Sequence, residues 1–453
     1  MTKQQRLVLI ISILASSIVF LDSSVINVAL PAIGREFGGG LLVQQWVVDI
    51  YLITMGALML IAGSLADIFG RKKIMLISLI GFAIASILCA VSVDGAFLIL
   101  ARGLQGVAGA LLVPCSLALI MSSFKGGAAG KAIGAWTAWT GIAFVVGPML
   151  GGFLVDVGSW RLIFAINLLP IVTTLWLLRM LESHRESTKN TKVDVLGATL
   201  STLGLGGVVY SLIEKANYGW NSPIILVPLI IGLTSLIFFT FHELKAEQPM
   251  LPMKLFKVRN FAVGNVATAA IYAGLSIAVF LISIFLQQIV GYKALTTGVA
   301  LLPVTILMFL LSSRFGVLAG KYGSRIFMTA GPLVAALGFL YMLMIGDKPY
   351  YLTQILPGVL LFGLGLSITI APLTTTILGA IDQKQSGIAS AVNNAIARIA
   401  GLIGVAALGL VTGPQLSLDG FHKGLIMVAS LLILGAGVSG IGIQKFKHHD
   451  SVT

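Results

Sequence analysis

Long apolar segments separated by short polar segments recur along the whole chain. Fourteen of them are about 20 residues or longer, which is the length that an α-helix needs to cross the hydrocarbon core of a bilayer. We therefore predict an all-α membrane protein with fourteen transmembrane helices. The predicted spans lie near 8–31, 43–66, 74–93, 96–121, 130–155, 160–180, 194–214, 223–242, 260–290, 296–318, 325–346, 351–378, 386–411 and 422–444.

Composition and charge agree with this interpretation. Hydrophobic residues make up 57% of the 453 residues, charged residues make up 10%, and the mean hydropathy is +1.02, which excludes a soluble fold of this length. The net charge of +13 could indicate binding to nucleic acid, but most of the basic residues fall in segments on one side of the membrane. With the N-terminus in the cytoplasm, 20 of the 29 Lys and Arg residues are cytoplasmic and six lie on the opposite side. The positive-inside rule then places both termini in the cytoplasm.

An internal repeat indicates how the spans are grouped. The segment "GSLADIFGRKK" (63–73) matches "GVLAGKYGSRI" (316–326) at five positions, four of them identical, with an offset of 253. Six spans occupy only about 180 residues at the length and spacing that membrane helices require, so two further helices must lie between two six-helix halves. Parallel repeats of six spans describe the major facilitator architecture, with a substrate site between the halves.

The repeat predicts six regions. They are an N-terminal six-helix bundle (1–181), a cytoplasmic linker (182–193), two inserted transmembrane helices (194–244), an amphipathic cytoplasmic linker (245–259), a C-terminal six-helix bundle (260–445) and a cytoplasmic tail (446–453).

Two opposite charges fall inside spans of the first half. Asp22 lies in "FLDSSVINVALP" (20–31) and Arg102 lies in the fourth span. A charge at the centre of a membrane helix costs about 3 kcal/mol on insertion scales, and a guanidinium cannot lose its charge by deprotonation. Arg102 therefore needs a partner, and Asp22 and Asp49 are the two candidates. Gln105 follows Arg102 on the same helix face.

The charged residues have two interpretations. A fixed ion pair could fasten the first, second and fourth spans together. Alternatively, Asp22 could bind a proton from one side of the membrane and release it to the other, because burial disfavours an ionised carboxyl group and a nearby guanidinium favours it. Asp49 could be a partly hydrated carboxylate near a helix end or a cavity residue. We predict proton coupling through Asp22, Arg102 and Asp49.

Other polar or aromatic side chains within spans could line a substrate cavity. Each could instead pack or form hydrogen bonds between helices. The second half has Arg398 but no acidic residue inside a span, so we expect neutral, zwitterionic or weakly anionic substrates to be preferred over dications, whose charges need carboxylate partners. The cavity candidates are Asn27, Gln105, Trp136, Asn393, Asn394 and Arg398.

Two glycine-containing motifs suggest moving parts. The first lies at the cytoplasmic end of the second span and could form a charge-paired latch. Alternatively, its basic residues could serve only to fix the orientation of the chain in the membrane. The second copy of this motif has Gly320 where the first has Asp67, so such a latch would be one-sided. The second motif, "GPMLGG" (147–152), lets the fifth span bend and pack closely. The residues are Gly63, Asp67, Gly70, Arg71 and Lys72 in the first motif, and Gly147, Pro148, Gly151 and Gly152 in the second.

The sequence offers no catalytic or metal-binding constellation. All five His residues lie in polar loops or the tail, and Cys89 and Cys115 both lie in apolar runs. No nucleophile, metal cluster or acid pair converges, so we predict neither an enzyme nor a metal site, and no cofactor other than protons as the coupling ion.

Five segments, in order, resemble the fourteen-span drug:proton antiporter family of the major facilitator superfamily. "LDSSVINVALP" resembles its first-span signature, and "GSLADIFGRKK" resembles the superfamily loop motif. The other three are "LILARGLQGVAGALLVP" (98–114), "GIAFVVGPMLGG" (141–152), in which Ala143 replaces a usual Gly, and "SWRLIFAINLLP" (159–170).

The resemblance covers nearly the whole chain and implies a function. It implies proton-driven export of a small molecule, and we expect a plasma-membrane antiporter that exports small amphipathic molecules by alternating access and acts as a monomer. The expected partners are a small-molecule substrate, protons and the lipid bilayer. A proton-coupled uptake symporter is the alternative within the same class, and a transporter-like sensor or membrane enzyme is the alternative from another class.

Overall fold

The structure is a computed structural model that describes residues 1–124, 127–181, 194–246, 249–346, 349–381, 386–413 and 415–444. Within these ranges every regular element is a helix, and fourteen helical segments are long and apolar enough to cross a membrane. The predicted number of spans is therefore confirmed. The predicted linker 182–193 and tail 446–453 lie outside the described residues.

The first half of the chain forms six spans. α1 packs against α4 and α5, and α4 packs against α2 and α3. The sixth span differs from its prediction, because helical hydrogen bonding is interrupted at Ile166 and Asn167 and leaves two short helices. The elements are α1 (Lys3–Phe37), α2 (Gly40–Phe69), α3 (Arg71–Ala90), α4 (Gly95–Ser123), α5 (Gly127–Val157), α6 (Leu162–Ala165) and α7 (Leu168–Arg179).

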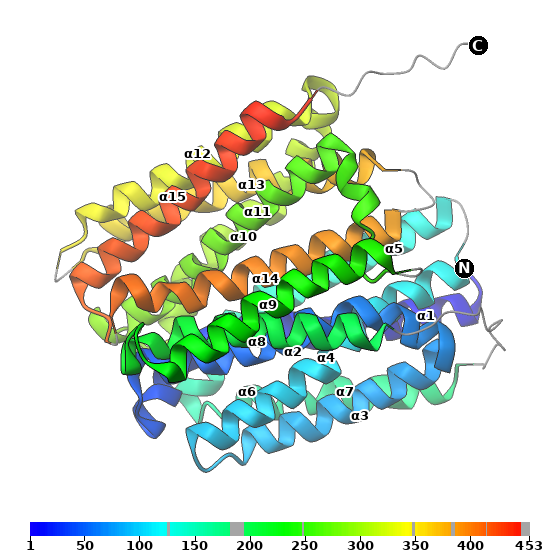
Figure 1. Cartoon of the computed structure of the whole chain (residues 1–453), viewed down its shortest axis with the longest axis horizontal. Coiled ribbons are helices and arrows are strands. Elements are labelled where there is room, and N and C mark those ends of the chain that lie inside the picture. The colour runs from blue at the N-terminus through cyan, green and yellow to red at the C-terminus, as the bar shows by residue number, and fades with distance from the viewer. Residues whose placement is uncertain are drawn as a thin grey trace. The chain divides into compact units, whose positions relative to one another are not determined.

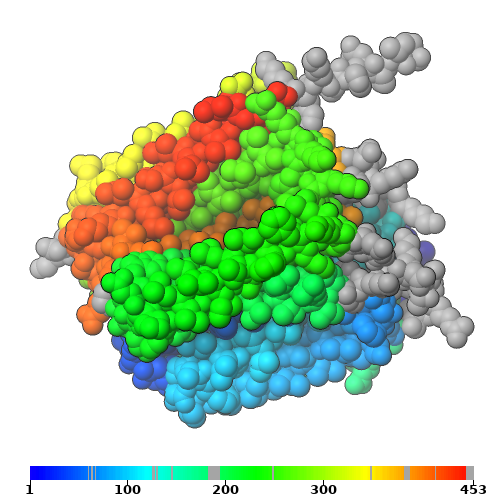
Figure 2. Space-filling model, viewed as in Figure 1, coloured from blue at the N-terminus to red at the C-terminus, as the bar shows by residue number. Residues whose placement is uncertain are grey.

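The two inserted helices pack as a pair beside α2. α8 (Val195–Tyr218) lies along α9 (Pro223–Lys245) and also contacts α2, as the green helices of Figure 1 show. The Trp46 indole on α2 donates a hydrogen bond of 2.8 Å to the Glu214 carboxylate on α8. α9 lies uncovered on the face shown in Figure 2, and many of its apolar side chains are exposed. This apolar surface is suited to lipid contact.

The α8–α9 contact provides a stability prediction. A Cβ atom on Gly207 would lie 2.3 Å from the Pro228 carbonyl oxygen, whereas a Cβ on Gly206 would meet nothing within 4 Å. We expect Gly207→Leu to lower the thermal unfolding midpoint by several degrees, because overpacking costs about 1–3 kcal/mol. The neighbouring Gly206→Leu is the matched control and should leave the midpoint nearly unchanged. Equal midpoints for the two variants would contradict close packing at Gly207.

The second half supplies the remaining spans. α12 packs against α13 and α15. In η1, Leu255 is buried while Lys254 and Lys257 are exposed; an amphipathic linker over the whole of 245–259 stays a prediction. The elements are η1 (Met253–Lys257), α10 (Arg259–Ile284), the π-helical η2 (Phe285–Ile289), α11 (Ala294–Tyr322), α12 (Ser324–Tyr341), η3 (Met342–Met344), η4 (Tyr351–Ile355), α13 (Leu356–Gly379), α14 (Ser386–Thr412) and α15 (Leu418–Gly442).

Contacts divide the chain into two compact units. Unit 1 comprises Met1–Leu251, Ile282–Val299 and Val405–Leu416, and unit 2 comprises Pro252–Leu281, Ala300–Gly404 and Ser417–Thr453. Unit 1 thus contains the N-terminal helices, the inserted pair, and one end each of α10, α11 and α14.

The internal repeat is visible in the backbone. Gly70 joins α2 to α3 with φ 88° and ψ 131°, and Gly323 joins α11 to α12 with φ 91° and ψ 137°. Both residues have positive φ, a conformation that glycine adopts without the steric penalty of a side chain. The two glycines occupy equivalent positions of the sequence repeat, so the repeated motif forms the same turn in both halves.

Candidate functional site

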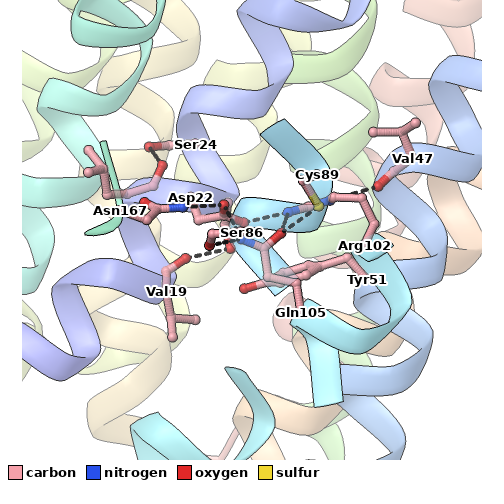
Figure 3. Close-up of polar contacts among 12 residues, drawn as sticks. Val19, Asp22, Ser24, Val47, Tyr51, Ser86, Cys89, Arg102, Gln105 and Asn167 are labelled. Atoms are coloured by element: carbon pink, nitrogen blue, oxygen red, sulfur yellow. Dashed lines mark hydrogen bonds and ion pairs between the residues drawn. The ribbon is translucent and has the colours of Figure 1, made fainter. Parts of the chain in front are cut away.

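An ion pair lies buried within the N-terminal helices. The Asp22 Oδ2 atom on α1 is 2.6 Å from the Arg102 Nη1 atom on α4, and each side chain is only 1% exposed. Figure 3 shows the two side chains pointing toward each other between their helices. Of the two carboxylates considered as partners for Arg102, the structure pairs it with Asp22.

Two amide side chains also donate to Asp22. Gln105 Nε2 and Asn167 Nδ2 each lie 3.0 Å from Asp22 Oδ1, so the carboxylate accepts three hydrogen bonds in all (Figure 3). Asn167 lies where the sixth span is interrupted between α6 and α7. We did not predict a role for Asn167, although it lies within the quoted motif 159–170; the only signal was a polar residue in an apolar run.

Arg102 has further partners besides Asp22. Its Nε atom donates to the Val47 carbonyl oxygen at 3.2 Å, and Nη1 donates to Gln105 Oε1 at 2.6 Å. The guanidinium also lies over the Tyr51 ring, 4.2 Å from its centroid, where a cation–π attraction stabilises a desolvated cation. Buried charges need this degree of pairing, because an unpaired charge in a low-dielectric interior is strongly destabilising.

The network continues from Gln105 to α3. Gln105 Nε2 donates to Ser86 Oγ at 2.9 Å, and Gln105 Oε1 accepts a weak 3.7 Å contact from the Cys89 thiol. We refer to Asp22, Ser86, Arg102, Gln105 and Asn167 as the charge cluster. It joins α1, α3, α4 and the break between α6 and α7 in one hydrogen-bonded group.

A glycine one turn after Arg102 brings the neighbouring helix close. A Cβ atom on Gly106 would lie 2.4 Å from the Tyr51 carbonyl oxygen and 2.1 Å from Thr54 Oγ1. Only glycine allows α2 and α4 to approach this closely. This approach places the Val47 carbonyl and the Tyr51 ring within reach of the guanidinium.

The hydrogen bond from Asn167 provides a second stability prediction. We expect Asn167→Ala to lower the thermal unfolding midpoint, because a buried hydrogen bond to a charged group contributes about 1.5–3 kcal/mol. Asn394→Ala is the control, since Asn394 is exposed and bonds only within its own helix among the contacts described. A midpoint in Asn167→Ala equal to that of the control would show that Asp22 does not depend on this donor.

Asp49 lies apart from the charge cluster. Its side chain is completely buried, and neither carboxylate oxygen has a hydrogen-bond partner among the described residues. Gln45, one turn earlier on α2, donates to the Val405 carbonyl oxygen at 2.6 Å within unit 1. An ionised carboxylate without partners is unfavourable in such surroundings, so Asp49 is a second candidate for binding a proton.

The predicted cavity residues have different surroundings. Asn27 bonds to carbonyl oxygens of its own helix, and the Trp136 indole donates to Ser16 Oγ at 3.0 Å. Asn393 donates to Asn265 Oδ1 at 3.1 Å and to Thr268 Oγ1 at 2.8 Å, which joins α14 to α10. Their contact with a substrate stays a prediction, as it does for Gln105 in the charge cluster and for Asn394 and the half-buried Arg398 on α14.

The predicted gating motif bonds to the main chain of neighbouring helices. Arg71 Nη1 donates to the Ala118 carbonyl oxygen at 3.1 Å, and Lys72 Nζ donates to the Leu181 carbonyl oxygen after α7. Gly70 forms the positive-φ turn described above. Gly63 lies within α2, and the side chain of Asp67 lies outside what the structure describes, so a charge-paired latch stays a prediction.

The "GPMLGG" motif packs closely on α1. A Cβ atom on Gly147 would lie 1.8 Å from Ser24 Oγ, and one on Gly151 would lie 2.3 Å from a methyl group of Val25. The motif therefore brings α5 into contact with the helix that bears Asp22. Pro148 and Gly152 of the same motif face the start of α11.

The described residues contain no group of three His, Cys, Asp or Glu side chains that could hold a metal ion. Cys89 and Cys115 are both buried, and neither is in a disulfide bond with a described residue.

Comparison with known proteins identifies the family. The Major Facilitator Superfamily model matches residues 12–405. The chain is 33% identical to the methylenomycin A resistance protein of Bacillus subtilis strain 168, over 89% of this chain and 87% of that protein. It is also 33% identical to the multidrug resistance protein Stp of Mycobacterium tuberculosis strain CDC 1551, over 92% of this chain and 78% of that protein.

Solved structures show the same fold at low sequence identity. A crystal structure of the peptide transporter POT aligns with a TM-score of 0.69 and 14% identity, over 95% of this chain and 93% of that one. The inward-open xylose transporter XylE from E. coli aligns with a TM-score of 0.67 over 97% of both chains.

The chain belongs to the major facilitator superfamily and is a multi-pass membrane transporter, not an enzyme. The resemblance identified from its motifs is therefore confirmed, and so is the predicted fold class. Its relatives include proteins named for resistance to drugs, in agreement with the drug-efflux family that the sequence resembles.

Proposed function

We propose that this protein is a proton-coupled antiporter that exports small amphipathic molecules by alternating access. The observation that supports the proposal most directly is the charge cluster. It holds a carboxylate and a guanidinium 2.6 Å apart and almost fully buried in a membrane helix bundle. Intramembrane ionisable groups of this kind are rare in membrane proteins and mark ion or substrate pathways.

The cluster can link proton binding to a change of conformation. Asp22 accepts hydrogen bonds from Arg102, Gln105 and Asn167. A movement that withdraws these donors favours proton binding, and their return favours release. Because the donors come from α4 and from the α6–α7 break, a shift of these elements relative to α1 would alter the protonation of Asp22. Asp49, buried without partners among the described residues, is the second proton-binding group of the proposal.

The proton gradient is a sufficient energy source for export. One charge moved through 100 mV gains about 2.3 kcal/mol, and a pH difference of one unit adds about 1.4 kcal/mol. One proton per cycle could therefore support a substrate gradient of several hundred-fold, since each 1.4 kcal/mol corresponds to a factor of about ten.

Transport in inverted membrane vesicles tests the proposal. Methylenomycin A and puromycin are suitable first probes, since relatives of this chain are named for resistance to them. We expect uptake into the vesicles when their interior is acidic and loss of uptake when an ionophore collapses the gradient. Transport that proceeds equally without a gradient would contradict proton coupling. Movement of substrate together with protons would instead identify an uptake symporter.

Substrate charge provides a further prediction. Asp419, the one described acidic residue within the helices of the second half, lies in the first turn of α15, whereas Arg398 lies within α14. In a panel of compounds matched for size, we expect neutral, zwitterionic and weakly anionic members to be transported better than dications, because dications need carboxylate partners. Arg398→Ala should reduce transport of the anionic members selectively. Efficient transport of dications that is unaffected by Arg398→Ala would contradict this prediction.

A further inference from the structure

A carboxylate at the end of α5 bonds to the beginning of α11. Asp156 Oδ1 accepts from the Ala294 backbone N–H at 3.1 Å, and Asp156 Oδ2 accepts from the Leu295 backbone N–H at 2.9 Å. These are the first two residues of α11, whose N–H groups have no partner within their own helix. The partial positive charge of a helix N-terminus favours an anion at this position.

The backbones of the two helices are in direct contact next to Asp156. A Cβ atom on Gly152 would lie 2.5 Å from the Ala294 carbonyl oxygen, and one on Gly298 would lie 2.4 Å from the Pro148 carbonyl oxygen. Pro148, Gly152 and Asp156 follow one another at intervals of one helical turn. The "GPMLGG" motif therefore brings α5 against the first turn of α11. Asp156 accepts hydrogen bonds from the backbone N–H groups at the start of that turn.

Two further polar contacts join helices within unit 1. Gln45 Nε2 donates to the Val405 carbonyl oxygen at 2.6 Å, and Gln287 Nε2 donates to the Val28 carbonyl oxygen at 3.0 Å. In these contacts, as at Asp156, a side chain bonds to main-chain atoms of a segment far away in the sequence. Asp156 is the charged member of the set, and charge-assisted hydrogen bonds are the stronger kind.

We propose that Asp156 is a positioning residue for the transport cycle: its bonds to the N-terminus of α11 keep the end of the transporter opposite the chain termini closed. This inference rests on the proposed alternating-access function, in which that end must open to release substrate. The α5–α11 bonds break when the end opens and re-form when it closes. Removal of the carboxylate therefore favours the open state without changing the charge cluster.

A cysteine reporter can measure this opening directly. Ser283 on α10 is completely buried in unit 1 and its hydroxyl has no hydrogen-bond partner among the described residues, so Ser283→Cys is a conservative change. The two native cysteines are buried. In nanodiscs both membrane faces are accessible, so the rate of maleimide labelling at position 283 reports opening independently of topology and of substrate.

We expect Asp156→Ala to increase the labelling rate about tenfold, which corresponds to about 1.4 kcal/mol in the closing equilibrium. Asp156→Asn, which keeps one acceptor oxygen, should give a smaller increase. Asp419→Ala is the matched control, because Asp419 is an exposed acid paired with Lys423 at the start of α15. An unchanged rate in Asp156→Ala and Asp156→Asn, with unfolding midpoints like wild type, would overturn the assignment.

A packing variant separates this inference from the proposed function. Gly152→Val should force α5 and α11 apart and increase labelling even in the presence of Asp156. If Gly152→Val increases labelling and Asp156→Ala does not, the end opens but Asp156 does not control it, and the inference fails alone. If no variant changes labelling, both the assignment of Asp156 and alternating access at this end are contradicted.

Discussion

Asp22→Asn is expected to abolish proton-driven transport while the protein still inserts and folds. The substitution keeps the size of the side chain but removes the group that binds and releases the proton. It also leaves Arg102 without a counter-charge in a buried site, and breaking a buried ion pair costs about 3–5 kcal/mol. We therefore expect a lower unfolding midpoint together with the loss of pH-dependent transport in proton-loaded vesicles.

A double variant separates a proton site from a fixed ion pair. Asp22→Asn with Arg102→Gln removes both charges, and we expect it to recover stability but not proton-driven transport. Glu36→Gln with Arg161→Gln is the control, because that pair is 2.7 Å apart but partly exposed, and exposed pairs contribute about 0–1 kcal/mol. If the neutral double variant transports with the pH dependence of wild type, the Asp22–Arg102 pair is structural and the proton site lies elsewhere.

Asp49→Leu is expected to have opposite effects on stability and transport. Replacement of a buried, unpartnered polar group by an apolar one is neutral or stabilising, so the unfolding midpoint should stay unchanged or rise. Proton-driven transport should fall by at least about tenfold, equivalent to 1.4 kcal/mol, because one of the two proposed proton-binding groups is lost.

Gln44→Leu is the matched control for Asp49→Leu. Gln44 is also buried on α2, and its amide atoms have no partner among the described residues, but it does not titrate. We expect this variant to keep full transport at a similar midpoint. A marked loss of stability in Asp49→Leu would mean that Asp49 has a structural partner, and wild-type transport by that variant would exclude Asp49 from proton coupling.

The fold could be predicted from the sequence because hydrophobicity alone specifies membrane helices. Each of the fourteen predicted spans corresponds to a helical segment of the structure, and the repeat aligned Gly70 with Gly323, which form the same turn in the structure. The interruption of the sixth span was not predicted, and it is a mild one, since Ile166 and Asn167 keep near-helical dihedral angles. Pro170, the third residue of α7, does mark the break, because it has no backbone N–H to donate to the Ile166 carbonyl oxygen.

The ion pair could be predicted in part, and its surroundings could not. A guanidinium in an apolar run requires an acidic partner, and only Asp22 and Asp49 were available. The sequence therefore reduced the choice to two carboxylates, and the structure shows that the partner is Asp22. The contribution of Asn167 depends on how the α6–α7 break faces α1, which is a tertiary property. The bonds from Asp156 to α11 join positions about 140 residues apart, and no local pattern in the sequence indicates such a contact.

The inserted helices pack against α2 of the N-terminal half, and the hydrogen bond from Trp46 to Glu214 is part of that contact. α8 and α9 belong to the same compact unit as α2, and α9 presents an uncovered apolar surface (Figure 2). In a cycle of rigid-body rocking, this pair should travel with the N-terminal half. A fluorophore on the exposed surface of α9 would then report the motion of that half from a position remote from the charge cluster, which makes the inserted pair a natural attachment site for a distance sensor.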